Sequence, residues 1–457
     1  MADTHVDAGE DLSGLSREEL IDRVVGLRRE LRAASMTAAS AVCAAPPAAP
    51  RAGLGSAKAE KRRRAFDFSK YYERHIALKV AYDGRTYDGL AALQESDNTV
   101  EGQLYVALEK TCLIRSRSEC RFSKAGRTDK GVSSSGQVVA LYVRSNRRVG
   151  EAPWADDSAE LDYAARLNCV LPPEIRVLAW APVDDAFDAR FSAKYRVYRY
   201  YFLRGSLDLA RMRQAASAFV GMHDMRNFCK ADTEKVHSFV RTLTNFDVTP
   251  VAGPFAADAP DDACGHDARL QLCAFTIKGR AFLWHQVRCM VSVLFLVGRG
   301  LEPPEVVSRL LDVEAQPGKP QYSMASELPL VLQEIGYEPS IAWHCATPPT
   351  QALASSALKT FCDTSINLAY VSTLLAAVTG AAPSEQWWPA MGHMPGGGDR
   401  YSNSKVSRGG ESLYIPLLRR SRNPPLVLRS LAELRAGRGG RAAEQPGQRV
   451  NEMDENE

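Results

Sequence analysis

The segment Phe122–Val132 reads Phe-Ser-Lys-Ala-Gly-Arg-Thr-Asp-Lys-Gly-Val and is the most informative stretch of the chain. Two glycines bracket four polar residues, which predicts a tight loop that presents charge rather than a core element. Asp129 stands between Arg127 and Lys130, and a neighbouring cation favours the ionised form of a carboxyl group. Such a loop suits a reaction on a nucleotide, although a structural Asp-Arg pair in a turn fits the same spacing.

Strand and helix patterns alternate before and after this loop. Residues 75–82 alternate apolar and polar side chains, which predicts a half-buried strand ending at Asp83-Gly84. Asn98, followed by Glu101, predicts the start of a helix. The remaining predicted elements are strand 137–143, helix 159–169, strand 177–181, strand 194–203, helix 207–220, strands 239–248 and 270–277, and helix 284–297. This order predicts an α+β fold.

The same patterns suggest a division of the chain. Residues 66–186 form a first α+β half that carries the loop, and residues 187–338 form a second half. The other predicted segments are an N-terminal amphipathic helix with a basic Ala/Pro-rich linker (1–65), an insertion or irregular loop (339–412), and a basic C-terminal segment with a disordered tail (413–457). The basic run at 58–64 is typical of a nuclear localisation signal, a phosphate-binding arm or a solvated charged segment.

Composition excludes several classes of protein. The 457 residues are 45% hydrophobic and 24% charged, with a net charge of only +3, so any polyanion-binding surface must come from local clustering. The ten cysteines form no C-x-x-C pair, which favours free thiols in a reducing compartment and disfavours a zinc site. No apolar run reaches the ~18–20 residues of a membrane span, and early acidic residues argue against a secretory signal and against a transit peptide. We expect a nuclear or cytoplasmic protein.

Beyond these patterns, Gly126–Val132 closely resembles the G-R-T-D-x-G-V catalytic loop of the TruA-type tRNA pseudouridine synthases. Further segments follow in that family's order over approximately Tyr72 to Tyr337, so the resemblance does not rest on one motif. These segments are Phe187–Ala193, Arg196–Tyr200, His223–Cys229 and Phe282–Arg288. Within the family, the chain looks most like the eukaryotic branch that modifies tRNA positions 38 and 39. The segments that carry this likeness are Phe66-Asp67-Phe68 at the start of the first half, the Leu15–Leu31 helix and Pro329–Leu332.

The resemblance implies a role for five residues. Asp129 would attack the uridine as nucleophile or base, Arg127 would displace or replace the extruded base, and Tyr198 would stack on the uracil. Arg288 would orient the catalytic carboxylate, and Leu330 would pack at the base pocket. The family usually has Gly-Leu-Tyr-Leu where this chain has Pro329–Leu332, and Lys130 stands where many relatives carry a small residue.

The resemblance also implies an architecture and a set of partners. It predicts two pseudo-symmetric halves whose antiparallel sheets join, flanked by helices, with a basic catalytic cleft between them. The substrate would be tRNA, no metal or other cofactor would be required, and no membrane would be involved. Bacterial relatives are homodimers, so a homodimer is one expectation for this chain, whose sequence leaves the oligomeric state open.

Two of these residues can also be interpreted without the family. Alternation along the strand at 194–203 puts Arg196, Tyr198 and Tyr200 on one face, an arrangement that suits a nucleic-acid platform or simply a core. Arg288, in an apolar helix, needs a carboxylate partner, and Asp129 is the candidate. His285 is more typical of a core histidine than of a general acid.

Three functions remain to be compared. The first is isomerisation of a tRNA uridine, in which the target base must be flipped out of its stack. The second is a tRNA-binding protein or RNA chaperone without catalysis, against which the intact Arg127-Thr128-Asp129 loop argues. The third is a synthase that acts on other tRNA uridines or on uridines outside tRNA.

Overall fold

The structure is a computed structural model that describes part of the chain: residues 66–93, 96, 98–152, 157–230, 236–251, 271–345, 358–367, 370–371 and 414–426. The chain divides into Met1–Ala65 and Phe66–Glu457, and all described residues belong to the second unit. The predicted helix at Leu15–Leu31, the basic run at 58–64 and the tail beyond residue 426 lie outside the described residues.

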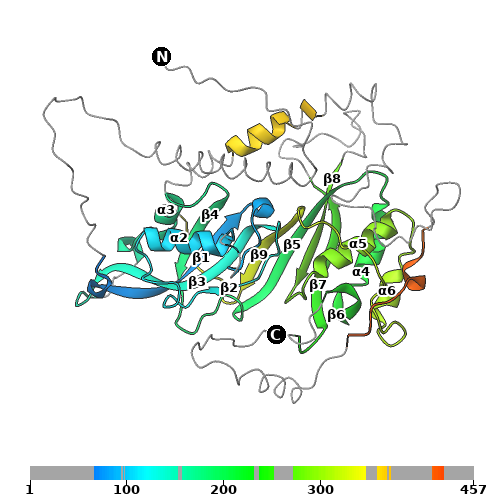
Figure 1. The fold of residues 1–457 in the computed structure, drawn as a ribbon, viewed down its shortest axis with the longest axis horizontal. Coiled ribbons are helices and arrows are strands. Elements are labelled where there is room, and N and C mark those ends of the chain that lie inside the picture. The colour runs from blue at the N-terminus through cyan, green and yellow to red at the C-terminus, as the bar shows by residue number, and fades with distance from the viewer. Residues whose placement is uncertain are drawn as a thin grey trace, which may run out of the picture. The chain divides into compact units, whose positions relative to one another are not determined.

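One large mixed sheet runs through the described part of the chain, with helices packed against it (Figure 1). Its ten described strands lie in the order β10-β4-β1-β3-β9-β5-β8-β7-β6, and β2 pairs with β3 beside this path. The strands are β1 (Tyr71–Tyr82), β2 (Ser123–Lys124), β3 (Ser133–Arg148), β4 (Ile175–Pro182), β5 (Ala193–Leu203), β6 (Gly221–Asp224), β7 (Val240–Pro250), β8 (Leu272–Gly279), β9 (Leu330–Tyr337) and β10 (His344–Cys345). The predicted α+β class is confirmed.

The centre of the sheet is the pairing of β3 with β9. These two strands run parallel, with Ser133 opposite Val331, whereas β9 runs antiparallel to β5. The resemblance implied two joined antiparallel sheets; the structure has one mixed sheet, because β3 and β9 pair in parallel. The Oγ of Ser134 donates to the carbonyl oxygen of Leu332 at 2.8 Å. A Cβ on Gly136 would lie only 2.4 Å from the carbonyl oxygen of Gln333, so glycine permits this close approach.

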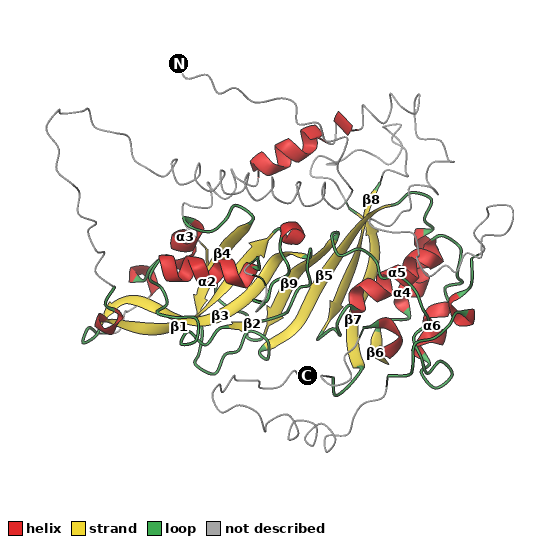
Figure 2. Cartoon of the chain, viewed as in Figure 1, coloured by secondary structure: helices red, strands yellow, loops and turns green. Residues whose placement is uncertain are grey.

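Helices pack on this sheet in two groups (Figure 2). Each group contributes to an apolar core. Buried side chains of α2 (Val100–Lys110) and α3 (Tyr163–Asn168) join those of β1, β3 and β4 in one core. The other core combines α4 (Leu209–Ser217), α5 (Gln286–Gly298) and α6 (Val306–Leu311) with β5, β7 and β8. Burying these apolar faces is the main stabilising contribution to both cores.

The start of α2 differs from the prediction by one residue. The cap is Thr99, whose Oγ1 accepts from the backbone N–H of Gly102 at 3.1 Å. Asn98 instead donates from its side chain to the carbonyl oxygen of Thr86. Both residue types suit a helix start, so composition alone does not choose between adjacent positions.

Other differences concern elements that the sequence patterns did not predict. Strands β6 and β9 and helix α6 were missed, and β9 lies at the centre of the sheet. The segment after Pro339 was expected to be irregular, but it contains β10, and residues 358–367 are helical. None of the helices in the described ranges combines the length and apolar character that crossing a bilayer demands.

Candidate active site

The predicted loop lies between β2 and β3 and is bound to β3 by backbone and side-chain hydrogen bonds. The N–H of Ala125 donates to the carbonyl oxygen of Val138 at 2.9 Å. The Nε2 of Gln137, which is fully buried, donates to the carbonyl oxygen of Gly126 at 2.9 Å. A side-chain amide buried inside the fold therefore fixes the start of the loop.

A second segment, which begins with the last residue of β1, supports the middle of the loop. The hydroxyls of Tyr82 and Thr128 lie 2.7 Å apart, and both residues are buried. The N–H of Leu90 donates to the carbonyl oxygen of Thr128 at 3.1 Å. Gly89 has a φ of +110°, and a Cβ there would lie 2.9 Å from that same oxygen, so only glycine fits. The backbone next to Asp129 is thus fixed by contacts with residues 82–90.

Strand β5 supports the loop from the other half of the sheet. The Nη2 of Arg196 donates to the carbonyl oxygen of Ala125 at 2.8 Å and to that of Arg190 at 3.0 Å. The Nε of Arg196 also donates to Ala125, at 3.2 Å. Arg196 therefore has a structural role beside the loop, and its guanidinium donors are occupied by backbone carbonyls.

Asp129 is contacted by two residues that directly precede α5. The indole Nε1 of Trp284 donates to Oδ1 of Asp129 at 3.2 Å. The Nε2 of His285 lies 3.4 Å from Oδ2. The Asp129 side chain remains 31% exposed, so a substrate can still reach the carboxylate.

The environment of Asp129 has opposing electrostatic effects. Burial raises the pKa of its carboxyl group above the ordinary value for aspartate, and the negative charge of Glu327 raises it further. The Arg288 guanidinium and the Trp284 hydrogen bond act in the opposite direction and favour the carboxylate. Lys130, expected to favour the ionised form, instead forms an ion pair with Asp88 at 2.8 Å. The cation that stabilises ionised Asp129 is Arg288.

Arg288 is the one residue of α5 that is not buried. Its Nη2 lies 2.8 Å from Oε2 of Glu327, and its Nε donates to the carbonyl oxygen of Ala325 at 2.8 Å. The prediction that Asp129 is its ion-pair partner is therefore wrong, although Arg288 is close enough to lower the pKa of Asp129. The Arg288 guanidinium therefore interacts electrostatically with two carboxylates, those of Glu327 and Asp129.

Tyr198 faces the same loop from β5. A Cβ placed on Gly126 would lie 4.0 Å from the Tyr198 hydroxyl. The ring meets that of Phe282 edge to face, with centroids 5.1 Å apart. Burial raises the pKa of Tyr198 to about 12, and the negative charge of Asp129 contributes to the rise. The hydroxyl is therefore neutral at physiological pH.

Leu330 and Arg127 occupy contrasting positions. Leu330 is the first residue of β9, pairs with Tyr200 and is only 5% exposed within the core that also contains Val132 and Leu283. Arg127 lies on the exposed surface of the loop, two residues before Asp129. The structure thus brings Asp129, Arg288 and Tyr198 around one loop, with Arg127 on its outer side.

His285 is neutral in this environment. Burial lowers the pKa of its imidazole to about 4, and the positive charges of Arg288, Lys230 and Lys319 add to the effect. Its Nδ1 is buried without a hydrogen-bond partner among the described residues. A tautomer with the proton on Nε2 leaves only a lone pair at Nδ1, and it directs the N–H toward Asp129.

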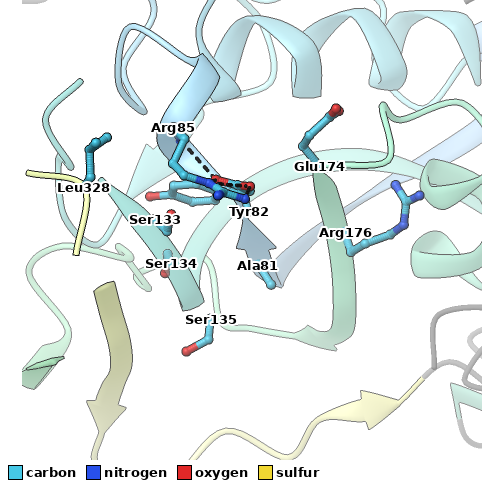
Figure 3. A pocket seen from close by; sticks show the side chains of 10 residues that line it. Ala81, Tyr82, Arg85, Ser133, Ser134, Ser135, Glu174, Arg176 and Leu328 are labelled. Atoms are coloured by element: carbon cyan, nitrogen blue, oxygen red, sulfur yellow. Dashed lines mark hydrogen bonds and ion pairs between the residues drawn. The ribbon is translucent and has the colours of Figure 1, made fainter. Parts of the chain in front are cut away.

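A hollow of about 500 Å³ lies next to the loop but is not lined by Asp129 (Figure 3). Tyr82 and the three serines at the start of β3 form part of its wall, with Glu174 and Arg176 on one side and Leu328 on the opposite side. Of its two arginines, Arg85 is paired with Asp83. The hollow therefore lies beside Tyr82, which supports the loop, and is not lined by the partly exposed carboxylate of Asp129.

Trp284 and Glu327 were not predicted as site residues. Trp284 lies within a segment that carried the family resemblance, and a tryptophan at the polar start of an apolar helix was the available signal. Glu327 had no local signal, because its partner is 39 positions away. Within the described ranges, His, Cys, Asp and Glu side chains form no group of three or more that could hold a metal ion.

The sequence of the chain is similar to those of known proteins. A sequence model of the family described as tRNA pseudouridine synthase matches residues 215–338. The tRNA pseudouridine synthase A of Methanothrix thermoacetophila is 32% identical over 264 residues, which cover 57% of this chain and 83% of that protein. This chain belongs to the tRNA pseudouridine synthase family. The residues matched by the family model include Trp284, Arg288 and Leu330, whereas the loop that carries Asp129 lies outside the match.

Eukaryotic members of the tRNA pseudouridine synthase family are more similar still. The tRNA pseudouridine(38/39) synthase of Bos taurus is 47% identical over 292 residues, covering 62% of this chain and 59% of the bovine protein. The human protein of the same name is 46% identical over 299 residues, covering 63% and 60%. The chain therefore spans about three fifths of the length of these two relatives.

Proposed function

We propose that this chain isomerises uridine to pseudouridine in tRNA, with Asp129 as the attacking carboxylate. The observation that carries the proposal is the environment of Asp129. A partly exposed carboxylate receives the Trp284 N–H and lies within the field of Arg288, on a loop supported from both halves of the sheet. Catalysis by positioned groups requires this kind of fixed and accessible side chain.

The residue types around Asp129 match the needs of the reaction. Isomerisation breaks the N1–C1′ bond, turns the base over and joins C5 to C1′. The proton on C5 leaves to solvent and N1 gains a proton, so atoms and charge balance without an oxidant or reductant. One carboxylate can start this sequence, as nucleophile at the sugar or as base, and it must be ionised to do so.

The base must first leave its stack to reach Asp129. Flipping a nucleotide costs a few kcal/mol, and contacts with aromatic rings and phosphates offset that cost. In the proposed complex, Tyr198 stacks on the uracil and contributes on the order of 1–3 kcal/mol. The exposed Arg127 occupies the space that the base leaves, and Leu330 lines the inner wall of the base pocket. The RNA lies in a cleft between residues 66–186 and 187–338.

We propose positions 38 and 39 of the anticodon stem-loop as the target. The bovine and human relatives carry these positions in their names, and they are the most similar proteins described above. Sequencing of pseudouridine in tRNA from cells with and without this gene tests the assignment. Loss of pseudouridine at positions 38 and 39 alone supports this assignment. Loss at other positions would assign those uridines as the target instead.

The rival function is tRNA binding without chemistry. Release of tritium from tRNA labelled at uracil C5 distinguishes the two, because only isomerisation removes the C5 proton. We expect tritium release that depends on enzyme concentration. Tight tRNA binding with no release would favour the rival.

A further inference from the structure

Trp284 has an unusual position for a large aromatic residue. The residue is 51% exposed, yet its ring is contacted by two neighbouring side chains. It stacks on His285, with centroids 4.3 Å apart and planes at 29°. The Nζ of Lys230 lies 5.2 Å from its ring centroid, and the Lys230 N–H donates to the carbonyl oxygen of Trp284. An exposed ring fixed in this way has one defined direction for its N–H.

The backbone around Trp284 explains why the ring faces the loop. His285 has a φ of 60°, a left-handed conformation that non-glycine residues seldom adopt. The preceding Leu283 is buried, and its N–H donates to Oε1 of Gln286 at 2.8 Å. The chain therefore turns sharply at the start of α5, with Leu283 in the core and Trp284 at the surface. Such conformations occur at functional sites when the surroundings hold them in place.

The consequence is that two neighbouring residues meet the two oxygens of one carboxylate. Trp284 reaches Oδ1 at 3.2 Å and His285 lies 3.4 Å from Oδ2. Both groups are neutral at physiological pH, because an indole has no charge and burial keeps the imidazole unprotonated. They can orient the carboxylate without neutralising it. A directly bound cation would hold Asp129 more tightly but would reduce its nucleophilicity.

We propose that Trp284 is a positioning residue for the proposed isomerisation: its indole N–H, braced by the stack on His285, fixes the rotamer of Asp129 for attack. This inference rests on the proposed function and goes beyond it, because the family resemblance implied no role for Trp284. The hydrogen bond also favours ionised Asp129, which keeps the carboxylate reactive. Loss of the N–H should therefore affect both orientation and protonation.

The first test compares Trp284→Phe with the wild type in single-turnover tritium release at saturating tRNA. Phenylalanine keeps an aromatic ring but has no N–H donor. We expect the rate constant to fall about tenfold or more, the size of effect expected when a hydrogen bond to a charged group is lost. The acid limb of the pH profile should move to higher pH, and the Kd for tRNA should stay within about threefold of wild type.

Trp343→Phe is the matched control. It makes the same substitution at a partly buried tryptophan that lies between β9 and β10 in the sequence, and we expect wild-type kinetics. A Trp284→Phe enzyme with the wild-type rate and pH profile would overturn the proposal. So would a weakened Kd with an unchanged rate at saturation, because that result would make Trp284 a contact for RNA.

The second test needs no activity. The sequence contains six tryptophans, so the indole N–H region of a ¹H–¹⁵N NMR spectrum has six expected signals, and Trp284→Phe identifies one of them. We expect this signal to shift as Asp129 titrates and to lose that titration in Asp129→Asn. A Trp284 signal indifferent to the Asp129→Asn substitution overturns the inference even if the enzyme is active. A wild type that releases no tritium would instead overturn the proposed function, whatever this signal does.

Discussion

The Nη2 of Arg288 lies 2.8 Å from Oε2 of Glu327, so the cation beside Asp129 is shared with a second carboxylate. Both residues act on Asp129, in opposite directions: Arg288 lowers the pKa of its carboxyl group and Glu327 raises it. The Glu327 side chain is 35% exposed, whereas that of Arg288 is 13% exposed. Together with burial, the largest cause, and the Trp284 hydrogen bond, the pair therefore influences the pH at which the proposed nucleophile becomes ionised.

Glu327→Gln should move the acid limb of the activity profile to lower pH. Removing the negative charge removes a cause of the raised pKa of Asp129 and frees Arg288 to interact with it. Single-turnover rates measured as a function of pH test this. Glu334→Gln is the matched control, since Glu334 accepts from the Tyr195 hydroxyl on the exposed surface and should leave the limb in place. A limb that moves upward in Glu327→Gln would contradict the account.

Asp129→Asn should be at least as stable as the wild type at neutral pH. The folded-state pKa of Asp129 is raised, so its favourable contribution is complete below the unfolded pKa of ~3.9 and is lost as pH rises through the folded value. Asparagine removes the charge and keeps an acceptor for the Trp284 N–H. Thermal melts across pH 4 to 8 should show an advantage for the variant that shrinks toward the acidic end.

Asp88 provides a control of the opposite sign. Its pKa is lowered by the hydrogen bond with Lys130, so its contribution is present above the unfolded pKa and is lost as pH falls through the folded one. Asp88→Asn should therefore lower the melting temperature at pH 7 and have less effect at pH 4. Equal pH trends for the two variants would disprove this electrostatic assignment.

The Tyr82–Thr128 hydrogen bond, which holds the loop in place, should contribute to the free energy of unfolding. Both residues are buried and their hydroxyls lie 2.7 Å apart. Tyr82→Phe and Thr128→Val should each lower the free energy of unfolding by about 1–2 kcal/mol, and the double variant should cost less than their sum. Urea unfolding measures these values. Strictly additive losses would show that the two hydroxyls do not interact.

Substitutions of Tyr198 should separate the ring from the hydroxyl. Tyr198→Ala removes the proposed stacking surface and should slow turnover by about ten- to a hundredfold. Tyr198→Phe keeps the ring on Phe282 and should retain most of the activity, because the hydroxyl, with a pKa of about 12, carries no charge near neutrality. Comparable losses in the two variants would assign the role to the hydroxyl.

The elements that sequence patterns predicted well have strong periodicity. Residues 75–82 alternate clearly and form most of β1, and the apolar stretch at 284–297 forms α5 nearly as expected. Strand β9 was not predicted, because two polar residues, Gln333 and Glu334, interrupt its apolar pattern. It also pairs with β3, which is distant in the sequence. Its place in the sheet depends on contacts that no local window contains.

The candidate site was predicted only in part, because some of its contacts join residues far apart in the sequence. Asp129 could be predicted because the composition and the motif of its loop are contained in one short segment. The partner of Arg288 was misassigned because two carboxylates compete for it, and only geometry distinguishes Glu327 from Asp129. Trp284 was missed because its exposure and the direction of its N–H follow from the left-handed backbone at His285.

The most direct test of the central claim compares wild type and Asp129→Asn on tRNA labelled with tritium at uracil C5, with tRNA affinity measured in parallel. We expect the wild type to release tritium and the variant to release none, while the two bind tRNA with Kd values within about threefold. Residual turnover by a folded Asp129→Asn protein would contradict the assignment of Asp129 as the attacking carboxylate.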